Sequence, residues 1–249
     1  MIRVLLTSCD SVSGKEVILL DSETLHHLRK VIRAEIGERV DVLTGEGRVF
    51  RGNLISLDER KAVVSVFEEK VLTRRPPRLI LAVSLLSSSR FDEVLDKVAE
   101  FGVDKLVPMI CDRTIVQLKK GEVKDRWLRR LSQVCRSVGT PFLPEVEPVM
   151  GFEDVLARFA PEVTRIFIPY LGSNSRHLLK ELLEFQELRE SGTSILILIG
   201  PEGDFSVREV ELAQKAGAVP VTLGPLVLRV ETATGVCAGM VHMVRSMDL

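Results

Sequence analysis

Short, nearly uninterrupted apolar runs recur through the last two thirds of the chain. Patterns of helical spacing separate them, as in residues 91–98 and 126–137. A strand that is apolar on both sides needs cover on both sides, and strands that alternate with helices join into a parallel sheet. We therefore expect an α/β fold for this part of the chain, with strands at residues 79–85, 106–110, 166–170, 195–200 and 219–223.

The first 72 residues have a different pattern. Their apolar or alternating runs are short, and glycines that favour turns lie between them, as in Thr44-Gly-Glu-Gly47. One stretch of helical spacing, residues 22–32, interrupts the series. Many short strands with glycine turns predict a small β-barrel. Its strands are expected at residues 2–7, 16–20, 39–43, 49–57 and 61–67.

The segment Thr73-Arg-Arg-Pro-Pro77 separates these two patterns. Adjacent prolines continue neither a helix nor a strand ladder, and they stiffen the chain towards an extended form. The sequence thus predicts a barrel over residues 1–72, a linker over 73–77 and an α/β domain over 78–249.

The charge and the cysteines limit the function classes. A formal net charge of −1 argues against a protein that coats nucleic acid indiscriminately, although local basic clusters such as residues 29–33 and 74–78 still allow RNA contact. The four cysteines are scattered without a Cys-x-x-Cys pair, which predicts no disulfide framework and no metal site and is typical of a reducing cytoplasm. No apolar stretch approaches the roughly 20 residues that span a bilayer, and no signal-peptide pattern is present. We expect a cytoplasmic protein that does not contact the membrane.

Two segments with glycine and proline follow the last two expected strands. Gly200-Pro-Glu-Gly203 and Gly224-Pro-Leu-Val-Leu-Arg229 occupy the place, beyond the carboxyl ends of strands, where open α/β sheets bind ligands. Glycine lets the backbone approach a flat ligand. Ser206-Val-Arg-Glu209 fits a capping box, so a helix should begin after the first loop. Either loop alone is better explained as a tight turn, and the glycine patterns of dinucleotide and ATP sites are missing from the sequence.

Together, however, the two C-terminal segments carry a specific resemblance. Ile-Gly-Pro-Glu-Gly at residues 199–203, with Leu-Gly-x-x-x-Leu-Arg-x-Glu-Thr-Ala at residues 223–233, is similar to the SPOUT-class methyltransferases. Within that class the chain resembles the RsmE family, which methylates N3 of a uridine in 16S ribosomal RNA. Other segments agree in order: His26-His-Leu-Arg-Lys-Val-Ile-Arg33, Lys97-Val-Ala-Glu-Phe-Gly-Val103, Asp112-Arg-Thr114, Trp127 and Leu143-Pro-Glu-Val146.

The resemblance implies a PUA-like N-terminal barrel for RNA and a C-terminal α/β domain with a deep trefoil knot, in a homodimer. It implies S-adenosylmethionine as the cofactor, S-adenosylhomocysteine as its product, and small-subunit ribosomal RNA, free or in the assembled subunit, as the partner. Carried over by position, the cofactor-binding residues are Tyr170, Leu171, Ile199, Gly200, Glu202, Gly203, Leu223, Gly224, Val227, Leu228, Thr232 and Ala233.

The chemistry of uridine N3 suggests roles for charged residues. N3 carries a proton, so methylation needs a route for that proton and a positive group for the developing anion. Arg229 and Glu231 are the candidate catalytic residues, with Arg229 as the cation; a salt bridge between them that only shapes the loop is the alternative. We assign no general base. For RNA contact we favour Arg33, Arg90, Lys97 and Arg113, for which simple surface solvation is the alternative.

Four departures from the family pattern stand out. Asp204 replaces a glycine, Leu226 an arginine and Val230 a threonine, and residues 136–140 read Arg-Ser-Val-Gly-Thr instead of Glu-Gln-x-Gly-Arg. Asp204 is favourable beside a helix N-terminus. The changes at Leu226, Val230, Ser137 and Thr140 concern the RNA-facing side more than the cofactor.

Three other functions stay open at this point. The first is another SPOUT methyltransferase that modifies a different base or a ribose 2′-hydroxyl. The second is an RNA-binding ribosome-assembly factor with weak catalysis. The third, an enzyme of small-molecule nucleotides, lacks the expected phosphate-binding motifs.

Overall fold

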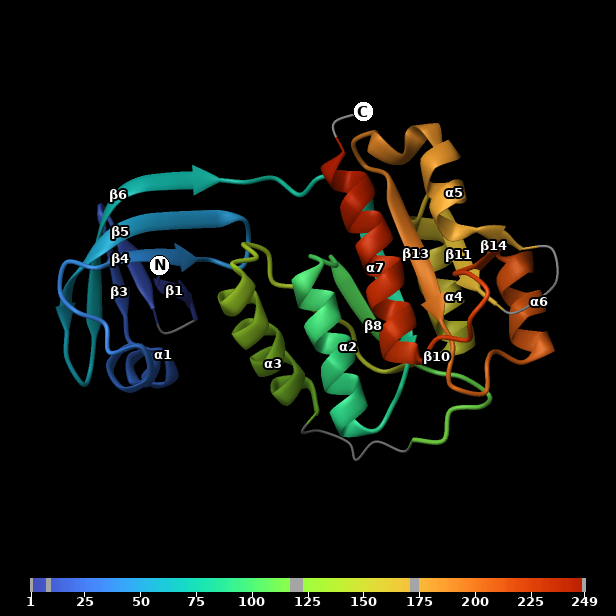
Figure 1. Ribbon diagram of the computed structural model, residues 1–249, viewed down its shortest axis with the longest axis horizontal. Coiled ribbons are helices and arrows are strands. Elements are labelled where there is room, and N and C mark those ends of the chain that lie inside the picture. Colours follow the sequence, from blue (N-terminus) through green and yellow to red (C-terminus); the bar gives the residue numbers. More distant parts are fainter. Residues whose placement is uncertain (1, 8–9, 117–122, 171–174, 248–249) are drawn as a thin grey trace. The chain divides into compact units, whose positions relative to one another are not determined.

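The computed structural model describes residues 2–7, 10–116, 123–170 and 175–247. The chain divides into two compact units, shown in Figure 1. The first contains residues 1–74 and 132–143, and the second contains residues 75–131 and 144–249. The return of residues 132–143 to the first unit was not predicted. The chain first leaves that unit between Arg74 and Arg75, within the expected linker.

The first unit is a six-stranded sheet in the order β1-β4-β5-β6-β3-β2. Neighbouring strands are antiparallel except for β1 and β4, which are parallel. Alternating apolar residues of these strands form one core, which Leu25 and Leu28 also join. The predicted barrel-like β unit is confirmed, and β2 is an addition. The strands are β1 (Ile2–Leu5), β2 (Ser11–Ser13), β3 (Glu16–Leu19), β4 (Arg39–Leu43), β5 (Arg48–Leu57) and β6 (Ala62–Val71).

The helical piece of this unit has two parts. The helix α1 (Ser22–His26) is capped by Asp21, whose side chain accepts a hydrogen bond from the Thr24 amide, and it continues as a π-helix, η1 (His27–Ile32). Arg33 ends the segment in the left-handed conformation, with φ of 57°. The expected range of residues 22–32 was right, but π-helix is rare and helical spacing alone does not predict it.

The second unit is built on a parallel sheet with the central order β10-β8-β7-β13-β11-β14-β12, and β9 pairs with β8. The predicted parallel α/β sheet is therefore confirmed. The trefoil knot stays a prediction, because strand order alone does not define how a chain threads. The strands are β7 (Arg78–Ser84), β8 (Lys105–Ile110), β9 (Glu145–Val146), β10 (Met150–Gly151), β11 (Arg165–Pro169), β12 (Arg176–His177), β13 (Ser194–Ile199) and β14 (Ala218–Thr222).

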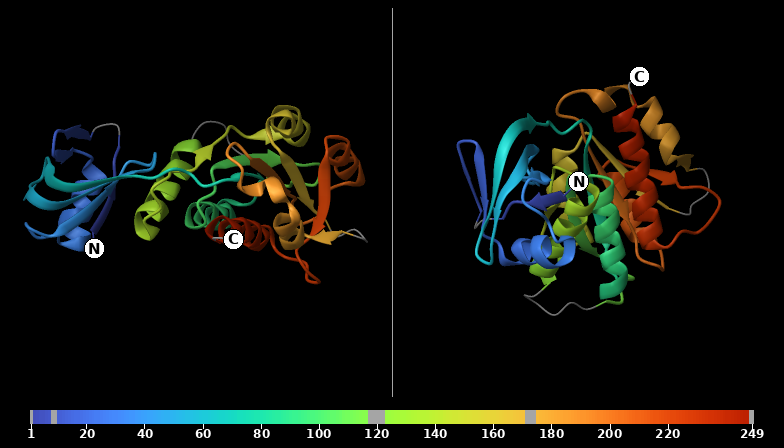
Figure 2. Two further views of the ribbon diagram at one scale, coloured as in Figure 1. Left: turned by 90° about the horizontal axis from the view of Figure 1, so that it is seen from above. Right: turned by 60° about the vertical axis from the view of Figure 1, so that its left-hand side comes forward.

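Helices cover both faces of this sheet, as the two views in Figure 2 show. On one face lie α2 (Ser88–Glu100), α5 (Leu178–Glu184) and α7 (Val230–Ser246), and on the other lie α4 (Phe152–Phe159) and α6 (Val207–Lys215). The helix α3 (Val123–Val138) packs Trp127 on Phe91 of α2. Two 3-10 turns, η2 (Ala160–Glu162) and η3 (Gln186–Arg189), complete the unit. None of the helices within the described ranges is long and apolar enough to cross a membrane.

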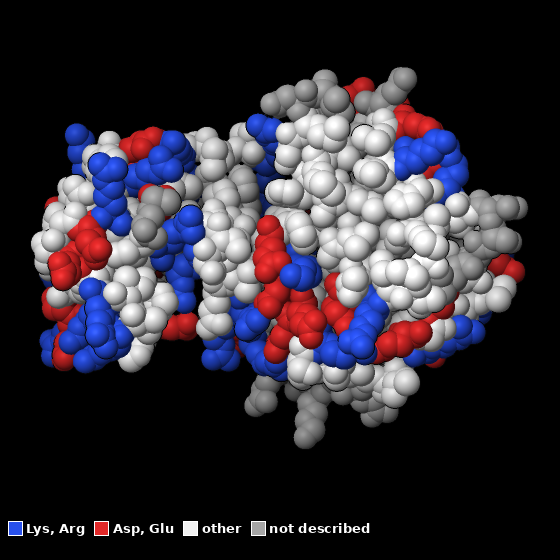
Figure 3. Space-filling view, viewed as in Figure 1, with Lys and Arg blue, Asp and Glu red and all other residues white. Residues whose placement is uncertain are grey.

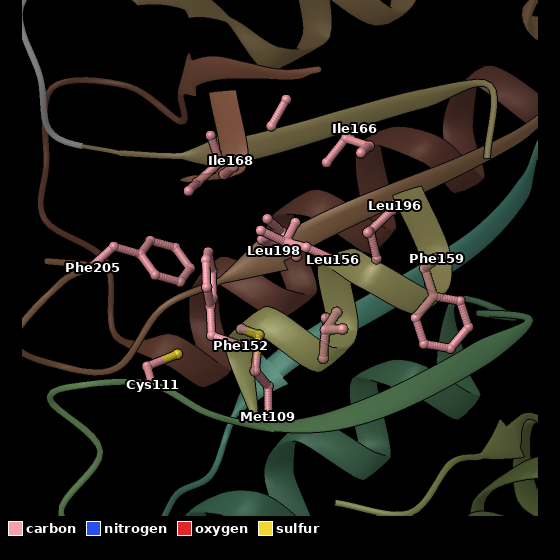
Figure 4. Packing of buried hydrophobic residues seen from close by; sticks show 14 of the residues in the cluster. Met109, Cys111, Phe152, Leu156, Phe159, Ile166, Ile168, Leu196, Leu198 and Phe205 are labelled. Carbon is pink, nitrogen blue, oxygen red and sulfur yellow. The ribbon is translucent and has the colours of Figure 1, made fainter. Parts of the chain in front are cut away.

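The core between the sheet and the α4–α6 layer is aromatic and aliphatic (Figure 4). Phe152 of α4 packs against Phe205, with ring centroids 5.5 Å apart. Phe205 ends the loop that follows β13, so this packing fixes the path of the first glycine-containing loop. The labelled neighbours are Met109, Cys111, Leu156, Phe159, Ile166, Ile168, Leu196 and Leu198.

A buried ion pair closes the amino-terminal edge of the parallel sheet. Arg245 near the end of α7 binds the Asp104 carboxylate and donates to the Pro77 carbonyl and, at 2.9 Å, to the Gly102 carbonyl. Asp104 is 2 % exposed in its side chain and also accepts a hydrogen bond from the Leu79 amide at 2.7 Å. We call this group the Arg245 network.

Candidate functional site

A pocket opens at the carboxyl edge of the parallel sheet, where β11, β13 and β14 end. It encloses about 650 Å³, part of which is open to solvent. Its wall combines backbone of the two glycine-containing loops with apolar side chains. The lining residues are Pro169, Tyr170, Ile199, Gly200, Pro201, Glu202, Asp204, Val221, Thr222, Leu223, Gly224, Leu226, Val227, Leu228, Val230 and Ala233.

In the first loop, residues 199–205, the backbone at Gly200 packs closely against the Phe205 ring. A Cβ on Gly200 would lie 3.0 Å from two atoms of the Phe205 ring, so this position has little room for a side chain. Asp204 adopts a left-handed backbone with φ of 62°, and its carboxylate accepts a hydrogen bond from the Phe205 amide at 2.8 Å. Aspartate is among the few non-glycine residues that tolerate this conformation. The departure from the family's glycine is therefore compatible with an unchanged loop.

The helix start after this loop is as predicted. Ser206 and Glu209 form the reciprocal capping box of α6. Glu209, which is buried, also accepts a hydrogen bond from the Asp112 amide at 2.9 Å, and the Asp112 carboxylate accepts one from the Ser206 hydroxyl at 2.6 Å. The neighbouring Arg113 donates to the Gly203 carbonyl at 2.5 Å. The segment around Asp112 thus holds the first loop in place.

The second loop, residues 223–229, presents apolar side chains to the pocket. Gly224 has φ of 122°, a conformation that L side chains rarely adopt, and its amide donates to the Thr222 hydroxyl at 3.2 Å. Leu226 and Val227 are 72 % and 76 % exposed at the pocket wall. Exposed apolar residues at a concave site are typical of a surface that a ligand covers.

Arg90, at the start of α2, connects the two sides of the pocket. Its guanidinium binds the Glu202 carboxylate on the first loop and, at 2.7 Å, the Glu231 carboxylate at the start of α7. The side chain of Glu231 is only 8 % exposed. We call this group the Arg90 network. This network gives the buried Glu231 carboxylate a hydrogen-bond donor. It also links the first loop to α7, the helix that follows the second loop.

The ionisation of Glu231 follows from these contacts. Burial raises the pKa of this carboxyl, but the hydrogen bond from Arg90, a backbone hydrogen bond, and the charges of Arg90 and Arg229 together lower the pKa below its ordinary value. Glu231 is therefore a carboxylate near neutral pH. A carboxylate held by Arg90 is suited to positioning, whereas proton donation needs a protonated group.

Arg229 precedes α7 and is exposed, between the pocket-lining residues Leu228 and Val230. Within the described ranges its side chain forms no ion pair, because Glu231 binds Arg90 instead. The structure therefore does not contain the Arg229–Glu231 salt bridge that was the alternative at the sequence level. Arg229 leaves a free guanidinium beside the N-terminus of a 17-residue helix.

The structure brings most of the predicted cofactor residues to one pocket. Two differ: Gly203 lies just outside the lining, beneath Arg113, and Thr232 faces a separate groove beside α2. Leu171 lies outside the described residues. The residues that meet at the pocket are Tyr170, Ile199, Gly200, Glu202, Leu223, Gly224, Val227, Leu228 and Ala233.

The four predicted RNA contacts have different surroundings. Arg33 is exposed in the first unit. Lys97 pairs with Glu100 at 2.8 Å and lies over Gly235 of α7. Arg90 and Arg113 are engaged with the first loop, as described above. Sequence reasoning missed these two structural roles, since the partners of Arg90 are 112 and 141 residues away.

Comparisons with known proteins agree with this geometry. Residues 73–242 match the family model described as an RNA methyltransferase domain, and residues 20–67 match the RNA methyltransferase PUA domain. The chain is 29% identical over 234 residues to the ribosomal RNA small subunit methyltransferase E of Synechocystis sp., covering 90% of this chain and 72% of that protein. It is 26% identical over 227 residues to the enzyme of the same name from Bacillus subtilis, covering 90% and 85%.

A solved structure gives the same picture. The small subunit methyltransferase E of Neisseria gonorrhoeae, crystallised with S-adenosyl methionine, superposes with a TM-score of 0.83 at 26% identity. The match covers 98% of this chain and 97% of that one.

Proposed function

The chain belongs to the RNA methyltransferase family, and from that premise we propose that it methylates N3 of a specific uridine in small-subunit ribosomal RNA, with S-adenosylmethionine as the methyl donor. The observation that carries the proposal is the single pocket that two separate glycine-containing loops form at the carboxyl edge of the sheet. The names of the relatives support ribosomal RNA as the substrate. The N3 position rests on the sequence resemblance.

The pocket residues fit the proposed cofactor. Backbone groups of the two loops can read the edge of an adenine, and Leu226 and Val227 supply apolar contact for its ring. The Glu202 carboxylate lies at the same wall, where Arg90 holds it. When bound, the cofactor supplies an electrophilic methyl group. The residues of the chain then have to place the uridine edge against it and stabilise the anion left when N3 loses its proton.

Arg229 is suited to that second task. The N3 anion of uridine shares its charge with the flanking carbonyl oxygens, so a cation beside it lowers the cost of deprotonation. No carboxylate in the described part of the chain binds the Arg229 guanidinium, and the positive end of the α7 dipole lies next to it. Glu231 acts through Arg90 by holding the start of α7 in position. We still assign no general base.

The wider partners are part of the proposal. Arg33 is exposed and is the first candidate for a phosphate contact. Arg90, Lys97 and Arg113, which bind other residues of the chain, are secondary candidates. A homodimer is supported by the apolar groove between α2 and α7, which contains Phe101, Gly235, Gly239 and Met243. Figure 3 shows the uncharged surface over α7. A cytoplasmic location is the setting in which such an enzyme would meet its substrate.

The experiment that tests the proposal uses the effect of N3 methylation on base pairing. A methyl group at N3 blocks Watson–Crick pairing, so reverse transcriptase stops at the modified uridine. We expect small-subunit RNA from cells with the gene to give a stop that is absent without the gene. An unchanged pattern of stops would disprove the N3 assignment, and ribose methylation mapped instead would favour another enzyme of the class.

Calorimetry distinguishes a methyltransferase from an assembly factor. Titration of the protein with S-adenosylmethionine should give saturable binding. Leu226 and Val230 replace polar residues of the family. These two replacements are the reason to test the alternative of a weakly catalytic RNA-binding protein. Absence of detectable binding would favour that alternative.

A further inference from the structure

An aromatic side chain stands exposed on the sheet of the first unit. Phe67 on β6 is 58 % exposed, and it is the one aromatic residue among the large exposed hydrophobic residues within the described ranges. The aromatic ring gains nothing from this position within the unit's own core, which is on the other side of β6 and includes Val64 and Val66. An exposed ring of this kind is available to a partner.

A β-bulge lies at this ring. In the pairing of β5 with β6, Arg51 is opposite Glu68 and Gly52 is opposite Val66, so Phe67 is the extra residue between them. The close approach of the two strands needs glycine, because a Cβ on Gly52 would lie 2.3 Å from the Ser65 carbonyl oxygen. The extra residue of a bulge has no partner opposite it in the ladder. Phe67 therefore has no neighbour directly opposite it on β5.

The surroundings of the ring are polar and hydrogen-bonding. The Arg39 guanidinium lies 6.0 Å from the centroid of the Phe67 ring. Register places Arg39, Asn53 and Ser65 in one cross-strand row on the face that Phe67 shares, and both Arg39 and Asn53 are exposed. Ile55, two residues after Asn53 on the same strand, is 47 % exposed.

The acidic groups of this face are partly neutralised. Asp41 and Glu68 both bind Arg51, and Glu68 also binds Lys70. Glu16, opposite Ser65, is the exposed carboxylate at the other end of the row. The positive Arg39 therefore stands next to the ring, and the neighbouring Asp41 and Glu68 carboxylates are paired with Arg51, which suits an anionic chain that approaches over Arg39.

We propose that the Phe67 surface, formed by Phe67, Arg39, Asn53 and Ile55, binds an unpaired nucleotide of the RNA substrate by stacking its base on the Phe67 ring. Aromatic rings exposed on a sheet stack on single-stranded bases, and guanidinium and amide groups beside them bond to the base edge or the phosphate. A duplex keeps its bases stacked inside, so it offers the ring no partner. A protein partner would need a larger apolar area than one ring and one isoleucine supply. This inference rests on the proposed action on RNA.

The test compares RNA binding by Phe67→Ala, Phe67→Trp and the unchanged protein, without methyl donor. The probes are a fluorescent single strand of small-subunit RNA sequence and the duplex of the same sequence. We expect Phe67→Ala to weaken single-strand binding about tenfold, with the slope of affinity against salt unchanged, since the ring carries no charge. Phe67→Trp should keep or improve affinity, and duplex binding should change less than twofold. Arg39→Ala should instead reduce the salt slope by about one.

Val12→Ala is the matched control, because Val12 is an exposed apolar residue elsewhere in the same sheet. Equal affinity of Phe67→Ala and the unchanged protein for the single strand would overturn the proposal, as would an equal loss for strand and duplex. Thermal unfolding of each variant excludes misfolding, and the tryptophan variant retains a ring in any case. If Phe67→Ala loses single-strand binding while no methylation is found, the proposed role of the Phe67 surface is supported and the proposed function is disproved.

Discussion

The two ends of α7 are each fixed by an arginine network, and the two differ in what they hold. At the end of the helix, Arg245 is 11 % exposed and binds Asp104 together with two backbone carbonyls. At its start, Glu231 binds Arg90, which is more exposed and shares its guanidinium with a loop carboxylate. The Arg245 network joins parts of the scaffold. The Arg90 network joins parts of the pocket.

This difference shows how one helix serves both stability and function. A buried pair contributes most when it is complete, because a carboxylate left without its partner has no water to replace it. The Arg90 network tolerates loss better, since solvent reaches Glu202, one of its two carboxylates. Substitutions at the amino-terminal edge of the sheet should therefore reduce stability. Substitutions at the carboxyl edge should reduce cofactor binding and catalysis.

Removal of Arg245 should have the largest effect. Arg245→Ala removes the guanidinium from the buried Asp104 carboxylate, which also accepts a hydrogen bond from the Leu79 amide. We expect the free energy of unfolding to fall by about 3–5 kcal/mol. Urea denaturation followed by circular dichroism measures it, with the exposed Arg208→Ala as a control. A loss below about 1 kcal/mol would contradict the structural role given to the Arg245 network.

Removal of Arg229 should leave stability unchanged and reduce catalysis. Its side chain is exposed and unpaired within the described ranges, so the free energy of unfolding should change by less than about 0.5 kcal/mol. We expect Arg229→Ala to lower kcat about 100-fold at saturating cofactor, because a preorganised charge at a developing anion has about that effect. Single-turnover methylation of small-subunit RNA gives this rate. Near-normal turnover would remove Arg229 from the catalytic site.

The Arg90 network should give an intermediate result. Arg90→Ala frees the first loop from α7 and leaves Glu231 without its side-chain donor. We expect about 2 kcal/mol less stability and about tenfold weaker binding of S-adenosylmethionine. Arg90→Lys retains the charge but cannot reach both carboxylates with a fork, so it should recover part of the stability and less of the affinity. Unchanged cofactor affinity in Arg90→Ala would show that the network does not shape the pocket.

A fall in pH should reduce the free energy of unfolding in part through protonation of Glu231, at the start of α7. Its pKa is lowered in the folded chain, so its contribution to stability is complete above the ordinary glutamate value and is lost as the pH falls through the lowered pKa. Stability measured from pH 7 down to pH 3 should therefore fall less steeply in Glu231→Gln than in the unchanged protein. Parallel pH profiles of the two proteins would contradict this assignment. This is the smallest expected effect, because several other carboxylates titrate in the same range.

Much of this arrangement follows from local sequence patterns. The buried strands, the capping box at Ser206 and the loops after β13 and β14 are each encoded within a few residues, so apolar spacing and turn residues predict them. The meeting of these loops at one pocket also follows, since parallel strands direct their carboxyl ends to the same edge.

The rest depends on contacts between distant residues. Nothing near Arg90 in the sequence indicates that its partners are Glu202 and Glu231, and an arginine on a helix is equally compatible with a solvent-facing role. The bulge at Phe67 is similarly hidden, because it depends on how β5 registers against β6. Local patterns predict elements, and the register and the ion pairs need the assembled fold.

The Arg245 network also makes the C-terminal helix necessary for completion of the second unit. Arg245 and the Pro77 carbonyl that it binds are 168 residues apart along the chain. Contacts of such separation form late, since a long loop has to close before they contribute. A nascent chain in which only β7 and α2 have been synthesised therefore still lacks α7, the helix whose first turn borders the pocket. The methyl donor should therefore bind only after α7 has docked, so the appearance of binding measures the completion of folding in the second unit.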